Sequence, residues 1–148
     1  MFHEVVEGDA SGDAGDAASA DDLLAAFEAM LHDAAATADR EALTEEAGVS
    51  ESTARAVVSG DISSVTVTDG AAVLAAADAD RDADAVVAEV RDHLLMGMTT
   101  AVLDVDAIAA RIDADLTGQE VQQALEGRTP MTLGQLAEVM SVIERRKR

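Results

Sequence analysis

One pattern of apolar residues occurs twice in the chain, and it restricts the possible fold more than any other feature. After Val49, apolar residues follow at five, eight and nine positions and a glycine at eleven, and the same intervals follow Leu116. Each copy continues into a triplet with threonine between two apolar residues, 65–67 or 131–133, and then into further apolar residues at helical spacing. Spacings of three and four place side chains on one helix face. The pattern therefore predicts a three-helix unit, stated twice.

The amino-acid composition favours an all-helical core. The chain has 148 residues, which is enough for one domain or for two small helical lobes that share a core. Apolar residues make up 49% of the chain but aromatic residues only 1%, so Ala, Val, Leu, Ile and Met must fill the interior. Abundant alanine and a single proline favour helix. We therefore expect an all-α protein of about eight helices.

The chain divides into four segments by composition. Residues 1–19 mix Gly, Ser, Asp and Ala without a period, which is typical of a disordered acidic arm. Residues 20–78 hold the first repeat, 79–103 an acidic joint and a central helix, and 104–148 the second repeat with a basic C-terminus. Neither repeat has many large apolar side chains, so both repeats and the central helix are expected to share one core.

Capping residues predict where the helices begin and end. The first helix should start near Ser19–Asp22, and a longer helix should run from Asp84 and end near Gly97, with 99–103 as a connector. The triplet 65–67 is ambiguous, since β-branched residues also suit an extended connector. A capping box is expected where Gln135 follows Thr132 by three residues. The other expected N-caps are Asp39, Ser50, Thr66 or Thr68, Asp104 or Asp106, and Thr117.

The net charge of −20 comes from thirty acidic residues against ten basic ones, nine of which are arginine. One interpretation is an acidic protein that avoids polyanions. The other is a protein of a halophilic cytosol, where dense surface carboxylate keeps the chain hydrated in molar salt. We favour the second, because the Debye length in ~1 M salt is only ~3 Å and the self-repulsion would be largely screened.

Residues 43–58, LTEEAGVSESTARAVV, resemble the helix-turn-helix of lambda-repressor/Cro-type DNA-binding domains, with Gly48 in the turn and Ala54 and Val57 pinning the second helix. Residues 108–140 are similar to the same family's continuation, but the turn has two extra residues and 113–115 stand where a glycine belongs. The chain also resembles a small acidic haloarchaeal family of unknown function, most clearly around LLMGMTTAVLDVD. That resemblance implies a compartment and a fold, and no activity.

Two functions remain open on this scaffold. The first is a non-enzymatic regulatory or adaptor protein that acts through contacts with an unidentified protein partner, and it predicts an exposed apolar patch. The alternative is a sequence-specific regulator that binds double-stranded DNA at high salt, although Glu51 and Glu120 lie where phosphates would approach. Monomer and dimer both remain open. The candidate nucleic-acid-binding residues are Ser52, Thr53, Arg55, Gln119, Gln122, Gln123, Arg128, Arg145, Arg146 and Arg148.

Other chemistry is not indicated by the sequence. There are no cysteines, and the three histidines are scattered, so we expect no metal site and no cofactor. Asp78, Asp80 and Asp82 mimic the spacing of a calcium loop but lack its glycine, and we interpret them as a hydrated linker whose last members cap the next helix. No catalytic motif is present, and Met96-Gly97-Met98 is typical of core filler or a helix end. With no apolar run near ~20 residues and no leader-like segment, we expect a cytoplasmic protein.

Overall fold

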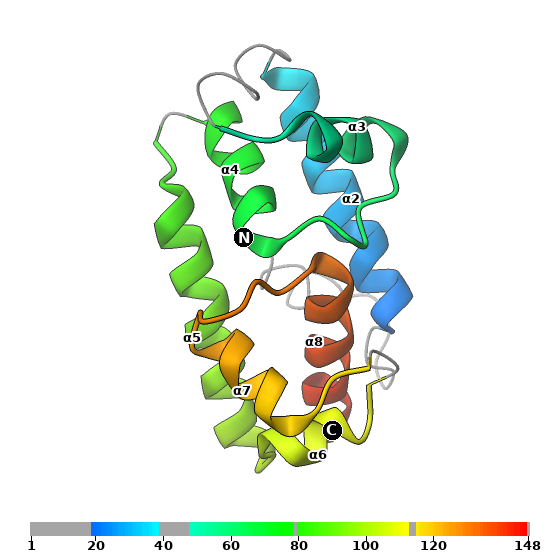
Figure 1. Ribbon diagram of the computed structural model, residues 1–148, viewed down its shortest axis with the longest axis vertical. Coiled ribbons are helices and arrows are strands. Elements are labelled where there is room, and N and C mark those ends of the chain that lie inside the picture. The colour runs from blue at the N-terminus through cyan, green and yellow to red at the C-terminus, as the bar shows by residue number, and fades with distance from the viewer. Residues whose placement is uncertain (1–18, 39–47, 79, 113–114, 148) are drawn as a thin grey trace.

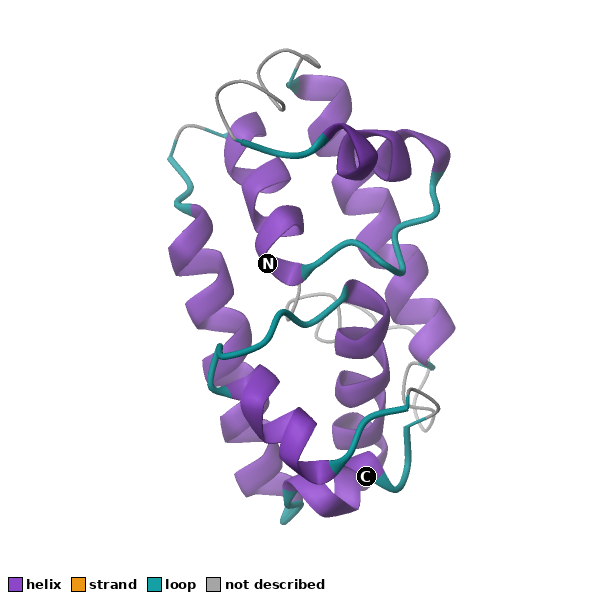
Figure 2. Ribbon diagram, viewed as in Figure 1, coloured by secondary structure: helices purple, strands orange, loops and turns teal. Residues whose placement is uncertain are grey.

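The computed structural model is all-helical over the residues that the structure describes, namely 19–38, 48–78, 80–112 and 115–147. These ranges contain seven helices, which is close to the expected eight, so the all-α prediction is confirmed (Figures 1 and 2). The helix expected after Asp39 and the arm expected at 1–19 lie outside the described residues, apart from Ser19. The helices are α2 (Ala20–Thr37), α3 (Glu51–Ser59), α4 (Val67–Ala77), α5 (Ala83–Ala101), α6 (Val105–Ala109), α7 (Gly118–Leu125) and α8 (Leu133–Lys147).

Local capping chemistry fixes most of the helix starts as predicted. Ser19 forms a capping box with Asp22, and Thr132 forms one with Gln135 through bonds of 3.0 and 3.1 Å. Each of these pairs satisfies two backbone N–H groups that have no partner inside the helix. Gly60 ends α3 in the left-handed conformation, with φ at +88°, which glycine adopts without steric cost. The remaining predicted caps that accept a bond from their own helix are Ser50, Thr66, Asp104 and Thr117.

The limits of α5 differ from the prediction at both ends. The helix begins at Ala83, one residue before the predicted start at Asp84, with Asp82 as its N-cap, and it passes through Gly97 to end at Ala101. Gly97 is buried, so it serves close packing and does not stop the helix. The turn comes instead at Val102, whose φ of 54° and ψ of 53° are left-handed. The expected connector 99–103 is therefore helical as far as 101.

The two triplets pair with each other across the middle of the molecule. Thr66 and Thr132 form an antiparallel β-bridge. The Val67 N–H donates to the Met131 carbonyl at 2.8 Å, and the Leu133 N–H donates to the Val65 carbonyl at 2.7 Å. Each threonine also caps the helix that follows it. The bridge is therefore reciprocal, because each triplet donates one backbone N–H to the other and accepts one in return.

The duplication extends further than the sequence pattern suggested, because α2 and α5 are equivalent. The helices lie on opposite sides of the α4–α8 pair, and each packs against both α4 and α8 (Figure 1). Their buried residues coincide at a constant shift of 63 residues. The pairs are Leu23 and Val86, Phe27 and Val90, Leu31 and Leu94, Ala34 and Gly97, and Ala38 and Ala101.

One continuous apolar cluster unites both halves. Val49, Val57 and Leu125 are buried in it, and Leu116 packs against it half-buried. In α4 and α8 the buried residues again coincide, now at a shift of 66 residues. These pairs are Val67 and Leu133, Gly70 and Leu136, Ala71 and Ala137, Val73 and Val139, and Leu74 and Met140. The scaffold is thus a four-helix centre of α2, α4, α5 and α8, with α3 at one end and α6 and α7 at the other (Figure 1).

Candidate functional site

The candidate nucleic-acid residues of α3 do not all face solvent. Ser52 and Arg55 are exposed, and Arg55 lies 3.9 Å from Glu51 in an exposed ion pair. Thr53 is buried, and its hydroxyl donates to the Asp69 Oδ2 at 3.0 Å. That bond links α3 to the first turn of α4, so Thr53 stabilises the fold and is removed from the candidate set.

The candidates on and after α7 lie toward the opposite end of the molecule from α3 (Figure 1). Gln119 and Gln122 are exposed, whereas Gln123 is half-buried. Gln122 donates to the Glu126 carboxylate at 2.7 Å, and the Arg128 Nε lies 3.1 Å from the same carboxylate. Glu126 therefore occupies two of the side chains that would have to reach a nucleic acid.

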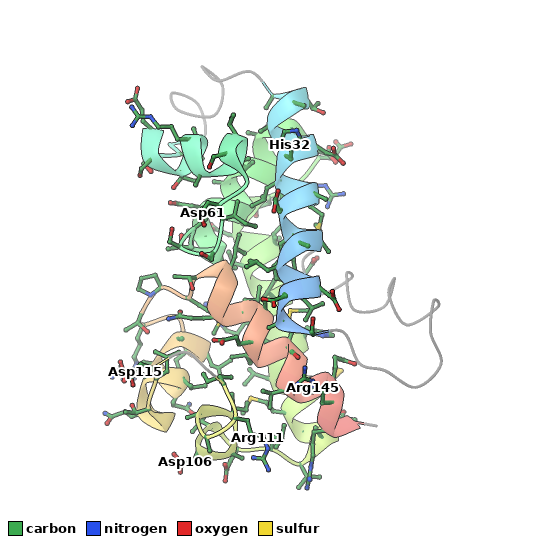
Figure 3. All side chains as sticks on the ribbon, turned by 90° about the vertical axis from the view of Figure 1, so that its right-hand side faces the viewer. His32, Asp61, Asp106, Arg111, Asp115 and Arg145 are labelled. Atoms are coloured by element: carbon green, nitrogen blue, oxygen red, sulfur yellow. The ribbon has the colours of Figure 1, made fainter. Side chains whose placement is uncertain are left out.

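One of the C-terminal arginines, Arg145, shares a cavity with Arg111, which was not among the predicted nucleic-acid-binding residues. Arg145 and Arg111 line one cavity of about 500 Å³ between α2, α6 and α8, and both are labelled near one end of the molecule in Figure 3. Arg146 is exposed, and its Nε donates to the Ala101 carbonyl at 3.4 Å. None of these three forms an ion pair with a carboxylate in the described ranges. Arg148 lies outside those ranges.

Exposed apolar side chains lie on the last turns of α5 and just after them. Among the described residues only four large apolar side chains are exposed, and three of them are here: Leu95 at 45%, Met96 at 71% and Val102 at 83%. Thr99 and Thr100 lie one turn after Leu95 and Met96, and their hydroxyls donate to those residues' carbonyls at 3.0 Å. We call Leu95, Met96, Thr99, Thr100 and Val102 the α5 end patch.

The α5 end patch was missed by the sequence analysis, which assigned residues 96–98 to core filler or a helix end. Met98 does pack against the core, but Met96 faces solvent. A signal was present, because no charged residue occurs between Leu94 and Leu103 in a chain that is 27% charged. Val102 is strained as well as exposed, because a β-branched residue in the left-handed region is a steric outlier.

The acidic joint serves structure in the way that the linker interpretation predicts. Asp78 accepts from the Asp80 N–H at 3.0 Å and from the Arg81 Nε at 3.0 Å, and Asp82 caps α5. No group of three or more His, Asp or Glu side chains within the described ranges is arranged to hold a metal ion. Nor does any helix in those ranges combine the length and the apolar character needed to cross a bilayer.

The described residues define an all-helical protein of two related halves, α2 to α4 and α5 to α8, with charge and apolar surface distributed unequally between them. The chain belongs to the family of unknown function DUF5791, whose family model matches residues 23–146. That match starts within α2 and ends within α8, and so includes both halves. No curated protein and no solved structure matches the chain.

Proposed function

We propose that this protein is a non-enzymatic adaptor or regulatory protein that binds a protein partner through the α5 end patch. The observation that carries the proposal is the presence of three exposed apolar residues, Leu95, Met96 and Val102, within one segment that carries no charged residue, in a chain with net charge −20. Contiguous exposed apolar surface is typical of interaction sites.

The equivalent surface of the first half supports this assignment. A shift of 63 residues places His32 where Leu95 stands and Asp33 where Met96 stands, and both are exposed. The scaffold thus accepts polar residues at these positions, so packing does not require apolar ones. The strained Val102 has the same implication, because strain at an exposed residue is commonly retained for function.

The partner suited to this patch presents an uncharged apolar face, such as one side of an amphipathic helix. If the protein works in molar salt, as its acidity suggests, surface charge attraction is screened within ~3 Å. Apolar contact persists under those conditions. An apolar patch is therefore an effective contact surface for such a protein.

The test is partner capture in high salt, with a photo-cross-linking residue placed at position 96 and, separately, at Ala88. Both positions are exposed on α5, and Ala88 lies outside the patch. We expect a specific adduct from position 96 only, and we expect Val102→Asp to remove it. Adducts of equal yield from both positions would contradict the proposal.

Direct DNA contact is the second candidate, and the arginines at the C-terminal end favour it. Arg111, Arg145 and Arg146 lack carboxylate partners in the part of the chain described, which leaves their charge available to phosphates. This candidate predicts that duplex DNA shifts the backbone amide signals of α3 or α7, and that Arg145→Gln weakens the effect while Arg81→Gln does not. Unchanged spectra at millimolar DNA in high salt would exclude it.

A further inference from the structure

Two equivalent contacts between the halves, the first at Gly134 in α8 and the second at Thr68 in α4, differ in how closely they pack. In the first contact, the Gly134 N–H donates to the Ser63 carbonyl at 3.0 Å, and a Cβ at residue 134 would lie only 3.0 Å from that oxygen. Gly134 is the second residue after the bridging Thr132. The second residue after the bridging Thr66 is Thr68, which carries a side chain where Gly134 has none and makes no corresponding backbone hydrogen bond to a described residue.

The second contact is consequently open. The Thr68 N–H donates to no acceptor among the described residues, and Thr68 lines a cavity of about 290 Å³ between α4, α5 and the loop from α7 to α8. This volume is at the small end of the range for small-molecule sites. Its walls are largely apolar and include Val87, Val90, Leu94, Leu125, Pro130 and Met131.

Two arginines line the same cavity. Arg91 is half-buried and lies over Gly127, where its guanidinium occupies the space that a Cβ would need. It forms no ion pair with a described carboxylate. Arg128 lines the cavity as well, and its Nε forms an ion pair with the Glu126 Oε2 at 3.1 Å.

The charge at this place is inverted relative to the other half. Glu28 lies over Gly60 as Arg91 lies over Gly127, and Asp61 follows Gly60 as Arg128 follows Gly127. Acidic residues outnumber basic ones by thirty to ten in the chain. Arg91 and Arg128 stand at the open contact, whereas the equivalent residues at the closed contact are acidic. This difference indicates that the open contact attracts negative charge.

We propose that this cavity binds a small organic anion, a carboxylate or phosphate carried on an apolar body. The Arg91 guanidinium holds the oxyanion, with Arg128 beside it, since guanidinium forms strong bidentate hydrogen bonds to such groups. The Thr68 N–H, in the first turn of α4, adds a donor at the positive end of the helix dipole. The apolar body then lies against Val90, Leu94 and Leu125. The cavity shares no lining residue with the α5 end patch, and the proposal does not depend on the function proposed for that patch.

The test uses hexanoate and hexanol as matched probes, with backbone amide signals as the readout. Hexanoate should shift the signals of Thr68, Arg91 and Arg128, whereas hexanol, which has the same number of carbon atoms and no charge, should bind much more weakly. Measurements belong at the lowest salt in which the full chain stays folded, because chloride competes for the same donors. Hexyl phosphate distinguishes a phosphate preference from a carboxylate preference.

Arg91→Gln should weaken hexanoate binding by about tenfold to a hundredfold, the usual effect of removing one charged hydrogen-bonding partner. Glu28→Gln is the matched control at the equivalent position, and it should leave the affinity within about twofold. Arg128→Gln provides a second variant, because the side chain of Arg128 is 74% exposed and contributes little to packing. Equal binding of hexanol, an unchanged affinity in both arginine variants, or shifts confined to the Arg111 and Arg145 end would each overturn the proposal.

Discussion

The two halves of this protein bury the same positions but fill them with side chains of different size. In the first half, α2 carries the large Phe27 while α4 carries Gly70, and in the second half the counterparts are Val90 and Leu136. Each half thus combines one helix that carries a larger residue with one that carries a smaller residue. The interior must be filled to near-crystalline density, but the volume can be divided among neighbours in more than one way.

The surfaces of the halves are less constrained than the core and have diverged further. Glu28 and Asp61 correspond to Arg91 and Arg128, and exposed His32 and Asp33 correspond to Leu95 and Met96. An exposed side chain contributes little to stability, so these positions are free to serve binding. The comparison teaches that function is to be sought where equivalent positions differ in chemistry.

The largest expected effect tests the division of core volume. Phe27→Ala should lower the free energy of unfolding by about 3–5 kcal/mol, because a fully buried aromatic side chain leaves a cavity. Val90→Ala, at the equivalent position, removes two carbon atoms, worth about 1.5 kcal/mol before any cavity cost. Denaturant unfolding in high salt measures both. An equal or larger loss from Val90→Ala would show that the two helices do not divide the volume in this way.

An intermediate effect tests the difference between the closed and open contacts. Gly134→Thr places a Cβ 3.0 Å from the Ser63 carbonyl and should cost about 1–3 kcal/mol through overpacking. Thr68→Ala, at the exposed equivalent position, should change stability by no more than about 0.5 kcal/mol. Similar losses in the two unfolding curves would mean that both contacts pack alike.

Much of the fold was predictable because its determinants are local. Ser50, Thr66 and Thr117 each satisfy a backbone N–H three residues ahead, so their role can be read from adjacent sequence. Gly60 follows the same rule for a helix end.

The errors share a non-local cause. Gly97 resembles a helix stop in sequence, yet burial in the folded protein keeps it within α5. Thr53 resembles an exposed base-reading residue, yet it bonds to Asp69, sixteen residues later. The pairing of residues 65–67 with 131–133, and with it the open cavity beside Arg91, depends on which distant segments meet. Such contacts are set by tertiary packing and not by propensity.

The smallest expected effect concerns Val102, and its sign is the informative part. Val102→Gly should raise the free energy of unfolding by about 0.5–1 kcal/mol. The glycine removes a left-handed strain of about 1–2 kcal/mol from the folded protein. Part of that gain is lost because glycine increases the backbone entropy of the unfolded chain. Val102→Ala, the control, keeps the left-handed cost and should change little. A loss of stability in the glycine variant would mean that this turn carries no strain.

The reciprocal bridge at Thr66 and Thr132 has a consequence for the ancestry of such a chain. Two identical short polypeptides, each holding one such triplet, could make the same pair of hydrogen bonds with each other. As a symmetric homodimer, they would be obliged to carry identical residues at both contacts. When the two copies are joined end to end in one gene, their sequences can change independently. An arginine can then replace an acidic residue at one of the two equivalent contacts while the other keeps its acidic residue. The covalent link at residues 78–82 therefore permits opposite charges at two equivalent positions, as at Glu28 and Arg91.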